Sequence, residues 1–99
     1  MRGFHLTVRA RSDLASIGRY TEKMWGREQR NKCLAQIDEC FHMLADNPSL
    51  GRSCDWIVPG YARYYIGKHV VFYRVAGDGI EIIRLLHERM GVTAHIRAD

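Results

Sequence analysis

Three side chains in the second half of the chain have the chemistry to bind an anion or to move a proton. Arg63 and Arg74 carry planar guanidinium groups, which hold carboxylate or phosphate through paired hydrogen bonds. His87 lies in the stretch "EIIRLLHERM", and an imidazole exchanges its proton near neutral pH. The histidine could act as a catalyst, contact a partner or end a strand, and its residue type leaves these roles open.

Three short segments rich in β-branched and aromatic residues carry these side chains. They read "YARYYIG", "HVVFYRVA" and "IEIIRLLH", and they are separated at Gly67-Lys68 and at Gly77-Asp78. Two-residue turns between such segments predict an antiparallel meander, in which Ile66 lies opposite His69 and Ala76 lies opposite Gly79.

This register divides the meander into two faces, because side chains alternate along a strand. The more apolar face, which we assign to the helices, carries Ala62, Tyr64, Ile66, His69, Val71, Tyr73, Val75, Ile80, Ile82, Arg84 and Leu86. The other face, which we expect to be open, carries Tyr61, Arg63, Tyr65, Val70, Phe72, Arg74, Glu81, Ile83, Leu85 and His87. A one-residue bulge would exchange the two faces beyond it.

The open face therefore collects Arg63, Arg74 and His87, with Arg74 directly across from Glu81. Basic side chains on such a face suit an anion, either a phosphate backbone or an acidic helix laid across the strands. The alternative is that these arginines pair with neighbouring carboxylates and have no further role.

The first half of the chain predicts a strand and two helices. Residues 4–8, "FHLTV", suit a strand, and Thr7 is a candidate helix N-cap. A helical period then runs through Ala10, Leu14, Ile17, Thr21 and Met24, and Trp25-Gly26 closes it. A second period runs from about residue 27 to Asn47-Pro48. The order β-α-α-β-β-β predicts one α+β domain over residues 1–99, with a helical hairpin packed on a mostly antiparallel sheet.

Residues 46–60 connect the second helix to the meander and hold both prolines of the chain. They show no clear hydrophobic period, which is typical of an ordered surface loop. We expect Trp56 and Ile57 to return this loop to the core. Cys54 lies in the same loop and would be reactive only if exposed.

Composition argues against several classes of site. The five histidines are scattered and the three cysteines lack metal-ligand spacing, so we expect no metal and no cofactor. Cys33 and Cys40 lie seven residues apart on one helical face and are expected to be reduced core thiols. No apolar run is long enough to span a bilayer, which favours a cytoplasmic protein. The net charge of +4 and the preponderance of arginine favour an acidic protein or a nucleic acid as partner.

Four motifs together resemble the ParE toxins of the RelE/ParE superfamily, which are the toxin halves of bacterial type II toxin–antitoxin pairs. They are "LTVRARSDLASIGRYTEKMWG", "NPSLGR", "PGYARYYIGKHVVFYRV" and "EIIRLLHERM", in the order and spacing of that family. The resemblance spans nearly the whole chain. It implies a β-α-α-β-β-β toxin that is inactive while an antitoxin is bound.

The resemblance implies one of two activities, because two branches of the superfamily share this fold. The ParE branch inhibits DNA gyrase with no chemistry of its own, and the "LLHERM" stretch resembles the ParE ending. Many ParE toxins carry an aspartate shortly after this histidine, where the present chain has Gly91. The RelE branch cleaves messenger RNA on the ribosome with a cluster of basic residues and a late Tyr or His. Lys68 is the only lysine after Lys32, so the lysine-rich RNA contacts of that branch are absent.

Gyrase inhibition by a non-enzymatic toxin is therefore the leading hypothesis. The alternative is a ribosome-dependent endoribonuclease that uses Arg63, Arg74 and His87. A third possibility is a member of the superfamily that is not toxic and serves as an interaction module.

The implied partner is a ParD-like antitoxin, acidic and with a ribbon-helix-helix DNA-binding N-terminus, in a hetero-oligomeric complex. Apolar residues along the first helix and the sheet are expected to anchor it. The predicted partner-binding face consists of Tyr61, Arg63, Tyr65, Arg74, Arg84 and His87. The C-terminal segment "GVTAHIRAD" is a candidate for part of the gyrase-binding surface.

Overall fold

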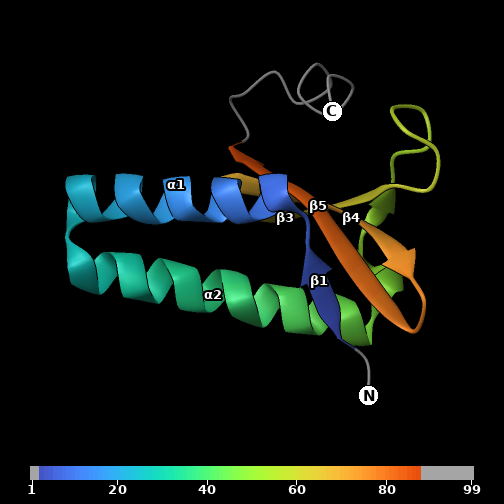
Figure 1. Cartoon of the computed structure of the whole chain (residues 1–99), viewed down its shortest axis with the longest axis horizontal. Coiled ribbons are helices and arrows are strands. Elements are labelled where there is room, and N and C mark those ends of the chain that lie inside the picture. The colour runs from blue at the N-terminus through green and yellow to red at the C-terminus, as the bar shows by residue number, and fades with distance from the viewer. Residues whose placement is uncertain (1–2, 88–99) are drawn as a thin grey trace.

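The computed structural model describes residues 3–87, and its elements follow the predicted order with one additional short strand. The elements are β1 (Phe4–Leu6), α1 (Val8–Trp25), α2 (Arg27–Asp46), a 3-10 turn η1 (Pro48–Leu50), β2 (Arg52–Ser53), β3 (Ala62–Ile66), β4 (His69–Ala76) and β5 (Gly79–His87). One five-stranded sheet has the order β1-β5-β4-β3-β2, in which β1 and β5 are parallel and the other neighbours antiparallel. The predicted α+β fold, a helical hairpin on a mostly antiparallel sheet, is confirmed (Figure 1). The strand β2 was not predicted.

The first helix begins where Thr7 leaves the sheet. The Thr7 hydroxyl accepts a hydrogen bond from the Ala10 N–H at 3.0 Å and donates one to the Ile83 carbonyl at 2.8 Å. One side chain therefore caps α1, as predicted, and also satisfies a carbonyl of β5 beyond the end of β1. The helix ends at Trp25, where Gly26 has φ +93° and ψ 171°. This positive φ favours glycine, because a residue with a Cβ rarely adopts it.

The main core lies between the helical hairpin and one face of the sheet. Its buried members are Ala10, Ile37, Cys40, Phe41, Leu44, Ala45, Val71, Tyr73, Ile80, Ile82 and Leu85. Cys33 packs partly buried against it, so the two helical thiols face the core as predicted. The buried residues of α2 all fall between Ile37 and Ala45, and the end of the hairpin nearer the interhelical turn extends beyond the sheet (Figure 1). Met24 belongs to that end and is exposed, although the helical period placed it on the apolar stripe.

A smaller core occupies the opposite face of the sheet, which the sequence predicted to be open. It consists of Cys54, Ile57, Val70, Phe72, Ile83 and Leu86, with Val58 and Tyr61 packed beside it. The loop after β2 thus covers the centre of this face. Ile57 returns to the core as predicted, whereas Trp56 remains 62% exposed.

The turns of the meander have the predicted register. Ile66 lies opposite His69, and Ala76 lies opposite Gly79. Arg74 is paired with Glu81, also as predicted. The two-residue turns therefore set the pairing of the strands near each turn.

A β-bulge in β5 makes the predicted faces wrong beyond it. Phe72 pairs with Arg84 while Tyr73 pairs with Ile82, so Ile83 is an extra residue on β5. One inserted residue reverses the alternation of every following side chain. Leu85 accordingly packs in the helix-side core and Leu86 in the loop-side core, the reverse of the prediction.

A buried ion pair joins this irregular part of β5 to α1. Arg84 and Asp13 meet through two hydrogen bonds, Nε to Oδ2 at 2.7 Å and Nη2 to Oδ1 at 3.0 Å. The same carboxylate accepts the Leu85 backbone N–H at 3.0 Å. The two side chains are only 10% and 15% exposed. Asp13 therefore neutralises a buried cation and also satisfies a backbone donor at the open edge of β5.

Tyr73 ties the chain after α2 to the centre of the sheet. Its hydroxyl donates to the Pro48 carbonyl at 2.7 Å and accepts the Gly51 N–H at 2.8 Å. Burial raises the pKa of this hydroxyl, so the group stays a neutral donor. A Cβ at position 51 would collide with the Tyr73 ring and the Arg63 carbonyl, which accounts for glycine there.

We predict that Asp13→Ala lowers the free energy of unfolding by about 3–5 kcal/mol, because it removes the carboxylate that pairs with the buried Arg84 charge and accepts the Leu85 N–H. Chemical denaturation at neutral pH would measure the change. Asp38→Ala is the matched control: Asp38 is an exposed helical aspartate paired with His42, and its loss should change stability by less than about 0.5 kcal/mol. The double variant Asp13→Leu, Arg84→Met should recover part of the loss. Equal effects of Asp13→Ala and Asp38→Ala would contradict this account.

We predict that Tyr73→Phe destabilises the fold by about 1–3 kcal/mol, because the partly buried Pro48 carbonyl and Gly51 N–H lose their common partner. Tyr65→Phe serves as control, since Tyr65 is 54% exposed and its hydroxyl stays in water. Thermal and urea unfolding of the two variants would be compared. If the Tyr73→Phe protein were as stable as the Tyr65→Phe protein, the two hydrogen bonds of the Tyr73 hydroxyl would contribute little to the stability of the fold.

Candidate functional site

Arg63 is held on the loop side of the sheet between two aromatic rings. Its guanidinium carbon lies 5.8 Å from the centroid of Trp56 and 5.8 Å from that of Tyr65. The Nε atom is buried and has no hydrogen-bond partner among the described residues. Stacking of this kind orients a guanidinium while leaving its charge available, so Arg63 is a pre-positioned cation on a surface with two exposed aromatic rings.

Arg74 is already neutralised within the sheet. Its Nε donates to Glu81 Oε1 at 2.8 Å, and the other oxygen of Glu81 lies 3.6 Å from His5 Nε2 on β1. The pair borders a hollow of about 550 Å³ that Tyr61 and the start of α1 also line. A phosphate at Arg74 would have to compete with a carboxylate that is in direct contact with it.

His87 lies on the helix side of the sheet, not on the face predicted for it. It is paired with His69, and the two imidazole rings stand edge to face with centroids 5.6 Å apart. Both rings line a groove that they share with α1 and α2. The cause is the bulge at Ile83, which reverses the alternation of β5 before His87 is reached.

The loop side of the sheet carries four residues of the predicted partner-binding face, Tyr61, Arg63, Tyr65 and Arg74. Tyr61 and Arg74 border the hollow on that side, whereas His87 faces the helices. Arg84 is buried with Asp13 and does not belong to an exposed face. The three residues suggested for RNA cleavage, Arg63, Arg74 and His87, are not brought together around one open site.

The described residues offer neither an exposed thiol at position 54 nor a group of metal ligands. Cys54 is fully buried, and burial raises the pKa of its thiol despite the opposing charge of Arg63. It therefore lacks the exposed thiolate of a nucleophile. Within residues 3–87, no three His, Cys, Asp or Glu side chains are grouped closely enough to hold a metal ion. No helix in the same range is long and apolar enough to cross a membrane.

The groove that contains His87 is larger than the hollow beside Arg74. It has a volume of about 960 Å³ and lies between the projecting part of the helical hairpin and the turn from β3 to β4. Its apolar lining comes from Ile17, Tyr20, Trp25, Ile37, Ile66 and Leu85. Tyr20 is 63% and Trp25 is 70% exposed, a large uncovered aromatic surface for a chain of 99 residues. Such grooves suit the apolar side of an amphipathic helix.

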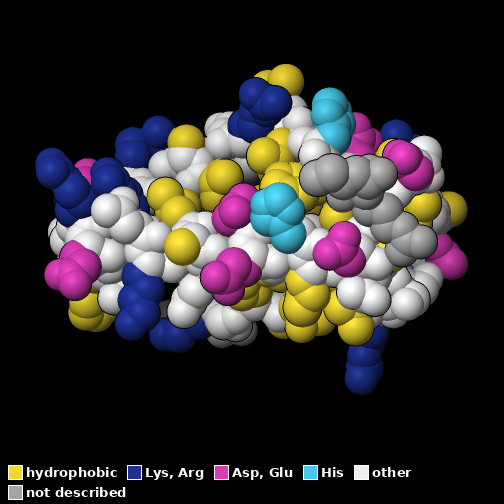
Figure 2. All heavy atoms as spheres, turned by 90° about the horizontal axis from the view of Figure 1, so that it is seen from below, with side chains coloured by type: hydrophobic (Ala, Val, Ile, Leu, Met, Phe, Trp, Pro, Cys, Tyr) yellow, Lys and Arg dark blue, Asp and Glu magenta, His cyan; other side chains and the backbone are white. Residues whose placement is uncertain are grey.

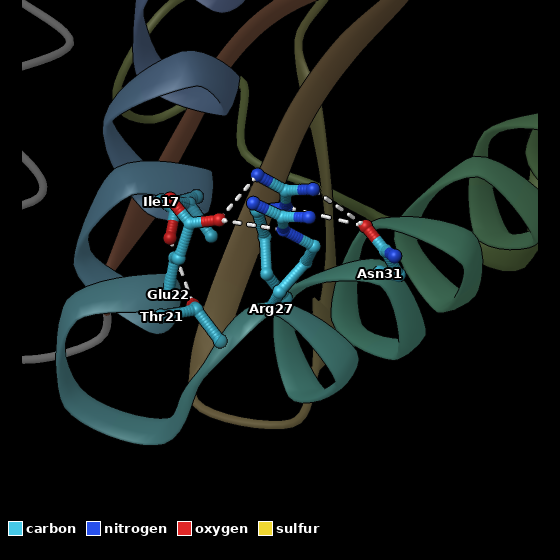
Figure 3. A network of polar contacts seen from close by, with 6 residues as sticks. Ile17, Thr21, Glu22, Arg27 and Asn31 are labelled. Carbon is cyan, nitrogen blue, oxygen red and sulfur yellow. Dashed lines mark hydrogen bonds and ion pairs between the residues drawn. The ribbon is translucent and has the colours of Figure 1, made fainter.

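The end of the hairpin, residues 19–32, is held together by a polar network, and we call this segment the hairpin tip. Glu22 on α1 accepts Arg30 Nη1 at 2.6 Å and lies 3.8 Å from Arg27 Nε, so one carboxylate serves two arginines of α2 (Figure 3). Arg30 also donates to Asn31 Oδ1 at 3.0 and 3.2 Å. Thr21 donates to the Ile17 carbonyl of the preceding turn at 2.7 Å (Figure 3). The network joins the two helices where the sheet no longer supports them.

Several residues that shape these surfaces were not predicted from the sequence. The sequence does carry a signal for Asp13. The residue lies three positions after Ala10 and four before Ile17, which places a carboxylate beside the apolar stripe of α1. Tyr20 and Trp25 could not be assigned to a groove, since their exposure depends on how far the hairpin projects past the sheet. Trp56 was expected in the core and instead stacks on Arg63.

Comparison with known proteins gives consistent matches. The model of the family "ParE toxin of type II toxin–antitoxin system, parDE" matches residues 4–92. Toxin ParE1 of Caulobacter vibrioides is 40% identical over 96 residues, which are 97% of this chain and 99% of that protein. Toxin ParE1 of Mycobacterium tuberculosis is 38% identical over 92 residues, which are 92% of this chain and 94% of that protein.

A solved structure agrees with these matches. The chromosomal ParDE TA system from P. aeruginosa contains a chain that superposes with a TM-score of 0.75 at 26% identity, covering 88% of this chain and 96% of that one. The family match and the two relatives each extend over most of the chain. The protein therefore belongs to the ParE toxin family of type II toxin–antitoxin systems.

Proposed function

We propose that this toxin acts in the bacterial cytoplasm by binding and inhibiting DNA gyrase, without chemistry of its own. The observation that carries the proposal is the separation of His87, which lies on the helix side of the sheet, from Arg63 and Arg74 on the other side. Cleavage by the RNA 2′-hydroxyl needs a proton acceptor, a proton donor and cations around a single phosphate. In this chain the histidine faces the helical hairpin, and Arg74 is engaged by Glu81. This arrangement favours a binding function over an endoribonuclease.

A ParD-like antitoxin is the proposed partner that neutralises the toxin. The groove between the hairpin and the sheet supports this proposal, because its exposed rings would lie against an apolar partner surface. An antitoxin segment that folds as an amphipathic helix would bury Tyr20 and Trp25 there. Aromatic residues at the centre of an interface commonly contribute most of its binding free energy. The charge of the hairpin tip would favour acidic residues on the outer side of such a helix.

We expect the purified toxin to inhibit supercoiling of relaxed plasmid by gyrase or to accumulate the cleaved gyrase–DNA complex. Because no proton transfer is required, His87→Ala and Arg74→Ala should retain this activity within about threefold. A parallel assay would follow cleavage of a messenger RNA during its translation. If gyrase is unaffected by folded toxin, and translated RNA is cleaved in a manner lost in His87→Ala and Arg74→Ala, the endoribonuclease is the correct function.

We expect Trp25→Ala to weaken the complex with the antitoxin encoded beside this chain by about 30-fold, as loss of an aromatic hot spot of about 2 kcal/mol would do. Trp56→Ala is the matched control, because Trp56 is similarly exposed but lies on the other side of the sheet. Titration calorimetry of each variant with purified antitoxin gives the two dissociation constants. A larger loss of affinity for Trp56→Ala would indicate that the antitoxin binds on the loop side of the sheet instead.

A further inference from the structure

The charge of the described chain is concentrated at one end. The hairpin tip holds five cations, Arg19, Lys23, Arg27, Arg30 and Lys32, against two carboxylates, Glu22 and Glu28, and has a net charge of +3. The rest of the described residues balance seven cations, Arg9, Arg11, Arg52, Arg63, Lys68, Arg74 and Arg84, with seven carboxylates, Asp13, Asp38, Glu39, Asp46, Asp55, Asp78 and Glu81. The body of residues 3–87 is thus neutral, and its net charge lies in the tip. Figure 2 shows Lys and Arg side chains gathered at that end of the molecule.

The network at the tip leaves most of this charge facing solvent. Glu22 is used internally, where it contacts Arg30 and Arg27 (Figure 3). Arg19 and Lys23 lie four residues apart, on one outer face of α1, and both are exposed. Lys32 is exposed on α2. Arg19 donates to the neutral Ser16 hydroxyl, so its charge is not cancelled by that contact.

We propose that the hairpin tip binds the phosphate backbone of duplex DNA, without sequence preference. The tip projects beyond the sheet (Figure 1), so cations of both helices can approach a long polyanion without a shaped pocket. Neither Arg19 nor Lys23 is part of the lining of the aromatic groove, which leaves that groove to a folded protein partner. This inference goes beyond the proposed action on gyrase and does not depend on it.

Duplex DNA fits this surface better than an acidic protein for a physical reason. DNA carries one charge per about 1.7 Å of its axis, whereas an extended chain of carboxylates carries at most one per about 3.3 Å. A small convex surface with few shaped contacts gains most from the polyanion of higher charge density. The cations lie on the two projecting helices, and their approach to a strand of phosphates needs no rearrangement of the core.

The test is fluorescence anisotropy of a labelled 30-base-pair duplex of mixed sequence, titrated with the full chain in the absence of gyrase. For about three phosphate contacts, the logarithm of the affinity should fall against that of salt with a slope near −2.7, or roughly 40-fold between 50 and 200 mM. Arg19→Ser, Lys23→Ser should weaken binding at 50 mM at least tenfold and reduce the slope to about −1. Glu28→Gln removes an exposed carboxylate from the tip and should tighten binding several-fold.

The matched control is Arg11→Ser, Arg52→Ser, which removes the same charge from exposed positions of the body. It should weaken binding less than threefold, with circular dichroism confirming that every variant is folded. Equal weakening by the two double variants would overturn the proposal, because net charge alone would then explain binding, and so would an absence of binding at 50 mM. Polyglutamate that displaces the duplex at equal charge concentration would assign the tip to an acidic protein instead. A gyrase assay on the same variants reports separately on the proposed function.

Discussion

The contact between Asp13 and the end of β5 determines how the two halves of this fold meet. A short parallel strand covers β5 only from Ile80 to Ile82, after which the edge of β5 has to be satisfied by other groups. The Thr7 hydroxyl donates to one carbonyl and the Asp13 carboxylate accepts one N–H; Thr7 is the N-cap of α1 and Asp13 lies in its second turn. The ion pair with Arg84 adds charge neutralisation at the same place. The direction of α1, and therefore of the whole hairpin, follows from these contacts.

That direction accounts for the main surfaces of the molecule. The hairpin leaves the sheet edge at an angle that buries α2 only from Ile37 to Ala45, so its other end has no sheet beneath it. The groove with Tyr20 and Trp25 and the cationic tip are both consequences of this overhang. A hairpin that covered the sheet fully would form a larger core but would offer neither surface. Part of the potential stability of this chain is thus left as exposed apolar and charged area.

The sequence was sufficient for the two helices and the meander, but not for the short strand β2 or for the faces of the sheet. Thr7, Gly26 and Pro48 mark the helix ends by local chemistry, and the two glycine turns determine the strand pairing near them, so these features were predicted correctly. The bulge at Ile83 has no comparable local signal, because Ile83 is one of several apolar residues in a row. Because of this one extra residue, His87 lies in the groove instead of on the predicted open face. It is therefore on the opposite side of the sheet from Arg63 and Arg74. The partial cover of the same face by Ile57 and Cys54 also arises from tertiary packing.

The groove and the hairpin tip both include residues of α1, so a partner bound in the groove would also affect the electrostatic potential of the tip. Tyr20 lines the groove while Arg19 and Lys23 lie on an adjacent face of the same two helical turns. An acidic helix seated in the groove would bring carboxylates close to these cations, and charges nearer than the screening length of about 8 Å at physiological salt still interact. It would lower the positive potential of the tip without touching every residue there. One bound protein could thereby cover the aromatic surface and weaken the attraction of the tip for a polyanion, through two different forces acting on a single helix.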